Sequence, residues 1–186
     1  YLEDQDFFRF HGIFRDVYLL TRPENHIDDI SIKTDNSGAL DISVTFRGKK
    51  SEYSCKIYDA DGNFITDKPF IPNVKLWNAE EPNLYTVVFS ACGEFISIRV
   101  GFREISWSGG VFKVNGTPVK MKGVNRHDTD AALGYAVPRE HILRDLILMK
   151  QNNINCIRTS HYPSAPEFYE MCDELGFYVV CECDIE

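Results

Sequence analysis

Side chains that can bind charge or transfer protons follow two apolar strands in the last quarter of the chain. Arg158 and His161 come at the end of the first strand, and Glu182, Asp184 and Glu186 occupy alternate positions at the end of the second. Because side chains alternate along a strand, these carboxylates share one face. Burying an unpaired carboxylate costs several kcal/mol, so the acids need cations, hydrogen-bond donors or a sugar as partners. We expect either an ion-pair network with Arg158 or another arginine, or a ligand site.

Alternating strands and helices are predicted to position these residues. The predicted order is a strand over 118–127, a helix that begins at Pro138 and ends near Asn152, the strand before Arg158, a second helix, and a strand over 177–186. Helices between strands predict parallel pairing with right-handed crossovers. Polar residues at the carboxyl ends of the strands are the arrangement of an α/β barrel, although the pattern also fits a doubly wound sheet.

The second predicted helix is marked at both ends. Ser164 is a candidate N-cap, and Pro166 lies in the first turn. Apolar residues at helical spacing follow them. Gly176 is typical of the position just after a helix, so the helix should end there, directly before the last strand.

The middle of the chain has the pattern of a β-sandwich. Its segments alternate apolar and polar residues, which predicts strands with one buried face. Asp61-Gly62 is a hairpin signal between two of them. Short strands with turns at this spacing predict a sandwich of two sheets, and nothing in the segment suggests catalysis, so we expect a scaffold. The predicted strands cover residues 30–33, 40–46, 53–58, 85–90 and 95–100.

The charge and composition of the chain exclude several classes of function. The 186 residues carry 20 Lys and Arg against 28 Asp and Glu, a formal net charge of −8, and no basic run. Nucleic acid and anionic membranes are therefore not expected partners. No stretch of the sequence is long and apolar enough to predict a membrane span.

The six cysteines predict reduced thiols rather than a metal site. No Cys-x-x-Cys pair is present, which disfavours zinc. The four cysteines between residues 156 and 183 lie at core-like positions, so we expect buried, reduced thiols in a cytoplasmic protein. A bridge between Cys55 and Cys92 in the sandwich is the alternative.

Two further features have structural explanations. Asn115-Gly116-Thr117 fits a glycosylation sequon, but Asn-Gly between two short apolar segments predicts a hairpin turn instead. His141 has no partner pattern in the sequence, and we expect it to be a surface or packing residue.

Residues 155–163, in the order Asn-Cys-Ile-Arg-Thr-Ser-His-Tyr-Pro, resemble the signature of glycoside hydrolase family 2. Further blocks resemble the large bacterial β-galactosidases of this family more than its β-glucuronidases or β-mannosidases. The resemblance covers nearly the whole chain in the family's order. These blocks are residues 1–6, 12–17, 75–85, 100–104 and 122–127, whereas residues 176–180 belong with the general family signature.

The resemblance implies a multidomain fold, in which an immunoglobulin-like β-sandwich is followed by the first β/α units of a (β/α)8 TIM barrel. Residues 1–20 would be the tail of a jelly-roll sugar-binding domain, 21–102 the sandwich, and 103–186 the N-terminal part of the catalytic barrel. The chain starts without Met and stops soon after an active-site strand, so we expect an internal fragment of a longer enzyme. That enzyme would be a homo-oligomer, and its remaining domains would be partners of this segment.

The implied activity is the hydrolysis of terminal β-D-galactosides with retention of configuration. Such enzymes use two carboxyl groups about 5 Å apart, one as acid/base and one as nucleophile. The family's two glutamates for these roles lie beyond residue 186, so the fragment itself is expected to be inactive. The alternatives are a β-glucuronidase of the same family and a non-catalytic sugar-binding or scaffold protein.

The resemblance also implies roles for particular residues of this chain. His127 and His161 correspond to histidines that stabilise the transition state by hydrogen bonds to sugar hydroxyls. Arg158 is expected to order nearby carboxylates beside the substrate. Glu186 corresponds to a Mg²⁺ ligand, and Asp6 to an aspartate that binds the galactose 6-hydroxyl and a Na⁺ ion.

Two positions depart from the family pattern. Asp184 stands where the best-known members have Asn, and Cys181 stands where they have Asp. An added or relocated carboxylate would alter local protonation or metal affinity.

Overall fold

A computed structural model describes residues 12–183 of the chain. The described residues form two compact units, one made of residues 19–119 and the other of residues 12–18 together with 120–183. Asp6, Asp184 and Glu186 lie outside the described residues, so the structure does not place the predicted sodium and magnesium ligands.

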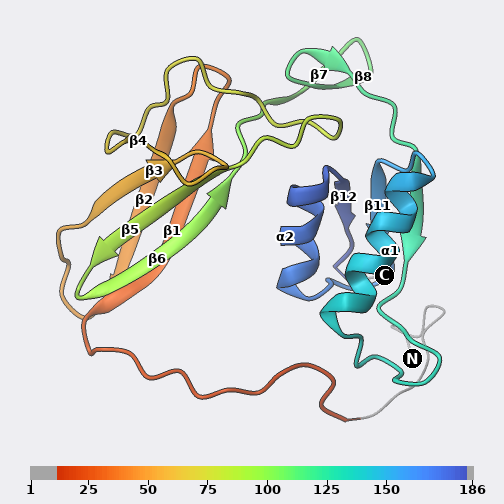
Figure 1. Ribbon diagram of the computed structural model, residues 1–186, viewed down its shortest axis with the longest axis horizontal. Coiled ribbons are helices and arrows are strands. Elements are labelled where there is room, and N and C mark those ends of the chain that lie inside the picture. The colour runs from red at the N-terminus through yellow and green to blue at the C-terminus, as the bar shows by residue number, and fades with distance from the viewer. Residues whose placement is uncertain (1–11, 184–186) are drawn as a thin grey trace. The chain divides into compact units, whose positions relative to one another are not determined.

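The unit of residues 19–119 contains two antiparallel sheets (Figure 1). One sheet pairs β1 (His26–Thr34) with β2 (Leu40–Arg47). The other has the strand order β4-β3-β5-β6, and the predicted strands of the middle segment are confirmed. Its strands are β3 (Ser54–Tyr58), β4 (Phe64–Thr66), β5 (Tyr85–Ala91) and β6 (Glu94–Val100).

Apolar residues from both sheets meet in one core. Ile27 of β1 and Leu40 of β2 are buried together with Ile57, Val87 and Phe89 of the other sheet. The alternation along β5, in which every second residue is buried, has the period of two that one-sided burial of a strand requires. The segment is therefore the two-sheet sandwich that the alternation predicted.

A small hairpin follows the sandwich in the sequence. It consists of β7 (Ile105–Ser108), β8 (Val111–Val114) and β9 (Thr117–Pro118). Asn115 and Gly116 form its second turn with φ angles of 52° and 76°, the left-handed region that Asn and Gly tolerate best. The hairpin prediction for this Asn-Gly pair is confirmed.

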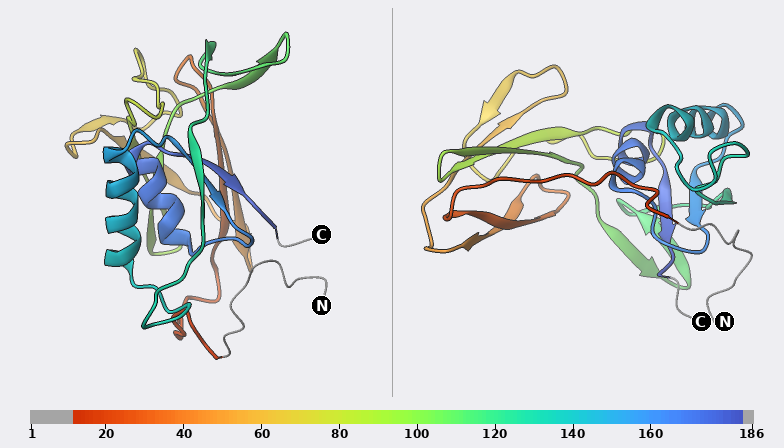
Figure 2. Two further views of the ribbon diagram at one scale, coloured as in Figure 1. Left: turned by 90° about the vertical axis from the view of Figure 1, so that its right-hand side faces the viewer. Right: turned by 90° about the horizontal axis from the view of Figure 1, so that it is seen from below.

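The second unit is built from alternating strands and helices that form two β-α-β crossovers. Its three strands form a parallel sheet in the order β10-β11-β12, and both helices cover the same face of that sheet (Figures 1 and 2). The predicted parallel pairing is confirmed. The elements are β10 (Gly123–Arg126), α1 (Arg139–Gln151), β11 (Cys156–Thr159), α2 (Pro166–Leu175) and β12 (Tyr178–Cys181).

The core of this unit lies between the helices and the sheet. Ile142 and Leu146 of α1 pack with Phe168 and Met171 of α2 and with Ile157 of β11, all of them fully buried or nearly so. These residues recur at helical spacing along α1 and α2, and they hold both helices on the sheet.

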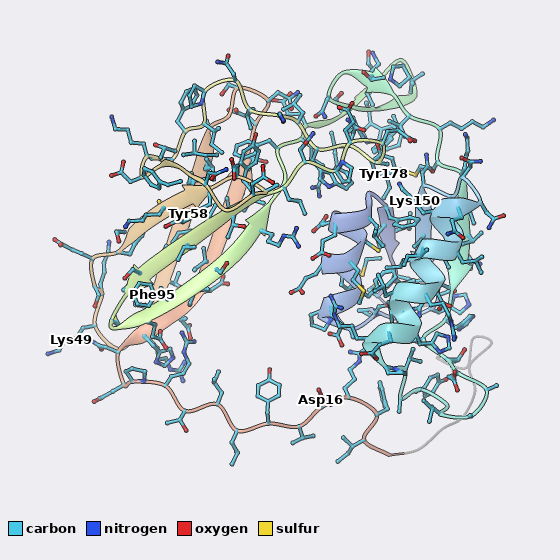
Figure 3. All side chains as sticks on the ribbon, viewed as in Figure 1. Asp16, Lys49, Tyr58, Phe95, Lys150 and Tyr178 are labelled. Atoms are coloured by element: carbon cyan, nitrogen blue, oxygen red, sulfur yellow. The ribbon has the colours of Figure 1, made fainter. Side chains whose placement is uncertain are left out.

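The end of α1 is also fastened to the chain that enters β12. The ammonium group of Lys150, labelled in Figure 3 close to Tyr178, donates a 2.6 Å hydrogen bond to the carbonyl oxygen of Gly176. It also lies 4.9 Å from the ring centroid of Phe177.

Some predicted element boundaries are wrong. The strand expected over 118–127 begins only at Gly123, because Pro118 belongs to the preceding hairpin. The last strand ends at Cys181, so Glu182 and Cys183 lie beyond it. Ala165, not Ser164, occupies the N-cap of α2 and makes no side-chain cap, whereas Gly176 ends the helix at φ 77° as predicted.

All six cysteines lie in the described part of the chain and are free thiols. No bridge joins Cys55 to Cys92. Cys156 and Cys172 are buried as predicted, but Cys181 and Cys183 are exposed, which contradicts the expectation for them. The physical reason is that β12 is the edge strand of the sheet, so its end has a neighbouring strand on one side only within residues 12–183.

Candidate active site

The carboxyl ends of the three parallel strands meet at one edge of the second unit. Register pairs Arg126 with Thr159 across β10 and β11, and Thr159 with Cys181 across β11 and β12. The residues that follow each strand therefore lie next to one another. They include His127 after β10, His161 after β11 and Glu182 after β12.

The two predicted histidines lie side by side at this edge. The ring centroids of His127 and His161 are 5.4 Å apart, with the rings at 77° to each other. The side chain of His161 is only 13% exposed. The structure thus brings together two residues separated by a crossover helix in sequence.

Arg158 and Glu182 lie directly beside His161. Nη2 of Arg158 is 2.5 Å from Oε2 of Glu182 and 3.2 Å from Nδ1 of His161. The same Oε2 atom lies 3.5 Å from Nδ1 of His161. This oxygen is buried and makes no aligned hydrogen bond within residues 12–183, so Arg158 holds it as an ion-pair partner.

Nδ1 of His161 has two neighbours of opposite charge. The guanidinium of Arg158, at 3.2 Å, can only donate a hydrogen bond, whereas the carboxylate oxygen Oε2 of Glu182, at 3.5 Å, can only accept one. The first contact favours an imidazole proton on Nε2, and the second favours a proton on Nδ1. Nε2 is a hydrogen-bond donor in the first case and an acceptor in the second.

Tyr162 connects the two strand ends. Its hydroxyl oxygen accepts a 3.1 Å hydrogen bond from the backbone N–H of Asp128, the residue after His127. Its ring lies 6.5 Å from that of His127 and 6.1 Å from that of Tyr135. Burial raises the pKa of the Tyr162 phenol to about 12, so the phenol stays neutral in the ordinary pH range.

A buried arginine anchors the end of β10. The guanidinium of Arg126 forms ion pairs with Asp128 and with Asp145 of α1, the latter at 3.1 Å, and lies 5.4 Å from the centroid of the Phe168 ring. The Arg126 side chain is 4% exposed. These contacts tie the strand end to both helices, so Arg126 lies in the interior of the unit rather than at its rim.

His141 extends this polar network. Its Nδ1 lies 2.9 Å from a carboxylate oxygen of Asp130, and its Nε2 lies 3.6 Å from Asp145. Backbone N–H groups of Ala132 and Leu133, with His141, lower the pKa of Asp130. His141, which we expected to be a surface or packing residue, thus has two carboxylate neighbours, and its spacing of four residues from Asp145 on one helix was the available signal.

The metal predictions stay untested by this geometry. Among residues 12–183, no group of three or more His, Cys, Asp or Glu side chains is arranged to hold a metal ion. The carboxylate of Glu182 already faces Arg158 and is not a free ligand.

Family comparisons identify the chain. Residues 25–103 match the family described as Glycosyl hydrolases family 2, and residues 105–186 match Glycosyl hydrolases family 2, TIM barrel domain. The chain belongs to glycosyl hydrolase family 2. Its parallel unit is therefore the start of the family's TIM barrel rather than a doubly wound sheet, and the sandwich before it is the immunoglobulin-like domain.

Similar proteins of this family are named β-galactosidases. The chain is 42% identical to Beta-galactosidase of Actinobacillus pleuropneumoniae and 39% identical to that of Staphylococcus xylosus. Each match covers 100% of this chain and 20% of the relative, so the chain spans about a fifth of the length of these family 2 proteins.

Solved structures of family 2 glycosidases resemble the chain as well. Beta-glucuronidase of Faecalibacterium prausnitzii has a TM-score of 0.91 at 32% identity, over 97% of this chain and 32% of that chain. Beta-glucuronidase 3 of Bacteroides uniformis has a TM-score of 0.83 at 27% identity, over 98% of this chain and 26% of that chain. No helix within residues 12–183 of this family 2 chain is long and apolar enough to cross a membrane.

Proposed function

We propose that this chain is a segment of a retaining β-galactosidase that hydrolyses terminal β-D-galactosides. The observation that carries the proposal is the match to proteins named β-galactosidase along 100% of this chain, at up to 42% identity. The position of His127 and His161 at the strand ends supports it, because barrel enzymes build their active sites at that edge.

Within such an enzyme, the described residues bind and orient the sugar. Nε2 of His161 hydrogen-bonds a sugar hydroxyl. Where the hydroxyl is the donor, this bond strengthens in the transition state, because positive charge on the ring makes the hydroxyl a better donor. His127 lies against His161 and acts on the same sugar. Arg158 contacts both Glu182 and Nδ1 of His161, so it keeps the Nε2 edge of His161 on the substrate side.

The chemical step itself needs groups from other parts of the enzyme. Retaining glycosidases use an acid/base and a nucleophilic carboxyl group about 5 Å apart. We assign neither role to Glu182, because its Oε2 atom faces a guanidinium at 2.5 Å. An ion-paired carboxylate is a weak proton donor and a weak nucleophile. Both catalytic glutamates would follow this segment in the enzyme.

We further propose Mg²⁺ and Na⁺ as the metals of the full-length enzyme. Glu186 would hold Mg²⁺, and Asp6 would bind Na⁺ and the galactose 6-hydroxyl. Carboxylate oxygens are the ligands that these hard cations prefer, so the donor chemistry fits. When bound, Mg²⁺ would supply positive charge to the site.

The organisation of the enzyme is part of the proposal. Residues 1–20 would end a jelly-roll domain, 21–102 form the sandwich, and 103–186 begin the barrel. The sandwich would act as a scaffold for the barrel in a cytoplasmic homo-oligomer. The free thiols of all six cysteines are compatible with a reducing compartment.

A second candidate activity is β-glucuronidase. It is favoured by solved structures similar to this chain, such as Beta-glucuronidase of Faecalibacterium prausnitzii at a TM-score of 0.91. A shared fold does not determine the substrate, however, because specificity depends on side chains around the sugar. A non-catalytic sugar-binding or scaffold protein is the remaining alternative.

An assay of the full-length protein with two substrates separates these candidates. We expect hydrolysis of nitrophenyl β-D-galactoside with a kcat/KM far above that for nitrophenyl β-D-glucuronide. The reverse preference would replace the proposal with β-glucuronidase. Binding of galactose without turnover of either substrate would indicate a non-catalytic protein.

A further inference from the structure

The backbone on both sides of His127 is bonded to the chain around His161. Before His127, the carbonyl oxygen of Arg126 accepts hydrogen bonds from the N–H of Ser160 at 3.1 Å and from its hydroxyl at 3.3 Å. After His127, the N–H of Asp128 donates to the hydroxyl oxygen of Tyr162 at 3.1 Å. The two neighbours of His127 in sequence are therefore hydrogen-bonded to the two neighbours of His161, Arg126 to Ser160 and Asp128 to Tyr162.

These bonds differ in kind. The bond from the Ser160 N–H to Arg126 continues the parallel ladder of β10 and β11, and the Ser160 hydroxyl adds a side-chain bond to the same carbonyl. Beyond the ladder, the phenol of Tyr162 supplies the acceptor for the Asp128 N–H. Since Asp128 is 8% exposed, the loss of that acceptor would leave a buried donor without its partner.

The ring of Tyr162 also contacts the rings on either side of it. It meets His127 at 63° and Tyr135 at 80°, both edge-on arrangements that favour aromatic pairs. The ring thus packs near the His127 imidazole, while the hydroxyl binds the backbone next to it.

We infer that Tyr162 is a positioning residue that holds His127 in register with His161. The inference rests on the proposed β-galactosidase function for its catalytic consequence, but its structural part does not. Tyr162 need not touch the sugar, because it acts through the imidazole of His127. Small displacements of such a donor reduce the rate more than they reduce substrate binding.

The first experiment compares Tyr162→Phe with the wild-type full-length enzyme. The variant keeps the ring and removes the hydroxyl, so we expect kcat to fall about threefold to tenfold with little change in KM. The amide of Asp128 should exchange with deuterium faster, and amides within α1 should exchange at the wild-type rate. An unchanged kcat, or an unchanged Asp128 exchange rate, would overturn the inference.

A matched control separates positioning from a general loss of stability. Tyr85 in the sandwich is a buried phenol whose oxygen accepts a 2.9 Å hydrogen bond from the N–H of Lys75. Tyr85→Phe removes the same kind of bond, and we expect its kcat to stay within twofold of wild type. An equal fall in kcat for both variants would show that Tyr162 only stabilises the fold.

A double-mutant cycle tests whether Tyr162 acts through His127. In the His127→Ala background, adding Tyr162→Phe should change kcat less than twofold, because the positioned group is gone. If the two substitutions instead lowered kcat by independent factors that multiply in the double variant, the inference would be contradicted. If the wild type hydrolyses no galactoside, the proposed function fails. The Asp128 exchange rate in Tyr162→Phe then decides alone whether Tyr162 holds the strand ends together.

Discussion

Nη2 of Arg158 lies 2.5 Å from Oε2 of Glu182, across the ends of β11 and β12. The N–H of Glu182 also donates a 3.1 Å hydrogen bond to the hydroxyl of Thr159, so backbone and side chain bind the same neighbouring strand. The ion pair expected between Arg158 and a strand-end acid is thus confirmed for Glu182. It gives this carboxylate a partner directly beside the imidazole of His161.

The isolated chain of 186 residues should hydrolyse no β-galactoside. Retaining hydrolysis needs two suitably spaced carboxyl groups, and Glu182 is held by Arg158. Release of nitrophenol from nitrophenyl β-D-galactoside should stay at the rate of buffer alone. Turnover that survives exhaustive purification and is abolished by Glu186→Gln would contradict this prediction.

Asn115 should stabilise the sandwich unit through its side chain. Its Oδ1 atom accepts a 2.9 Å hydrogen bond from the N–H of Glu104, and its Nδ2 atom donates a 3.0 Å bond to the carbonyl of Trp77. Asn115→Ala loses both bonds at a left-handed φ of 52°. We expect the free energy of unfolding to fall by about 2–3 kcal/mol, measured by denaturant titration.

Asn73→Ala is the control for backbone strain. Asn73 is exposed and has a φ of 54°, but makes no side-chain hydrogen bond within residues 12–183. Its replacement should cost about 1 kcal/mol from strain alone. Equal losses for the two variants would mean that the bonds of Asn115 to Glu104 and Trp77 contribute nothing.

Much of the architecture could be predicted because it depends on local patterns. Alternation along β5 and the helical spacing of Ile142 and Leu146 reflect burial on one side of a strand or helix. Gly176 ends α2 because a left-handed residue without Cβ is favoured there. The side-by-side placement of His127 and His161 followed from the parallel strand order that these patterns indicated.

The polar network around Arg126 could not be predicted in the same way. Arg126 pairs with Asp145, nineteen positions along the chain, and a charged residue in a strand gives no sign of which distant acid will face it. The exposed Cys181 and Cys183 show a second limit. Apolar character predicts burial only where another element covers the face, and β12 is an edge strand in the described chain.

Alkaline pH should destabilise the second unit through two half-buried phenols. Burial raises the pKa of both Tyr162 and Tyr169 to about 12, from the ordinary value of 10.0. Above about pH 10 the unfolded chain releases these phenolic protons, while the folded chain retains them up to about pH 12. The free energy of unfolding should therefore be constant with respect to these groups below pH 10 and fall between pH 10 and 12.

Replacement of the phenols tests this assignment. Tyr162→Phe and Tyr169→Phe should each make the decline between pH 10 and 12 shallower, in denaturant titrations across that range. Burial also raises the pKa of the Cys172 thiol to about 12, so part of the decline begins near pH 9 and should persist in both variants. In a variant that carries both substitutions, a fall in the free energy of unfolding as steep as that of the wild type would rule out the phenols as its source.

Glu186→Gln in the full-length enzyme should raise the Mg²⁺ concentration needed for half-maximal activity. The variant keeps the shape of the side chain but removes one anionic oxygen ligand from a divalent cation. Glu182→Gln is the control, since its carboxylate faces Arg158, and it should leave the Mg²⁺ midpoint unchanged. An unaltered midpoint for Glu186→Gln would make Glu186 a structural residue.

His161→Ala should lower kcat of the full-length enzyme more than it raises KM. If the hydrogen bond between Nε2 and a sugar hydroxyl forms mainly in the transition state, its loss appears in kcat and in kcat/KM together. The expected cost is on the order of 2–4 kcal/mol, as for removal of one donor from an oxyanion hole. Steady-state kinetics per active site, together with the melting temperature, give the measurement.

The surroundings of His161 make its catalytic and structural roles separable. Arg158 and Glu182 contact each other directly at 2.5 Å, so their ion pair survives the loss of the imidazole and limits the damage to the fold. His26 in the sandwich, whose Nδ1 lies 2.6 Å from the carbonyl oxygen of Pro23, provides a matched His→Ala control with unchanged kcat. Loss of a residue that only packs lowers the number of folded molecules but leaves the rate of each folded molecule unchanged. A His161→Ala enzyme with a depressed melting temperature and wild-type kcat would therefore remove His161 from the residues that contact the sugar.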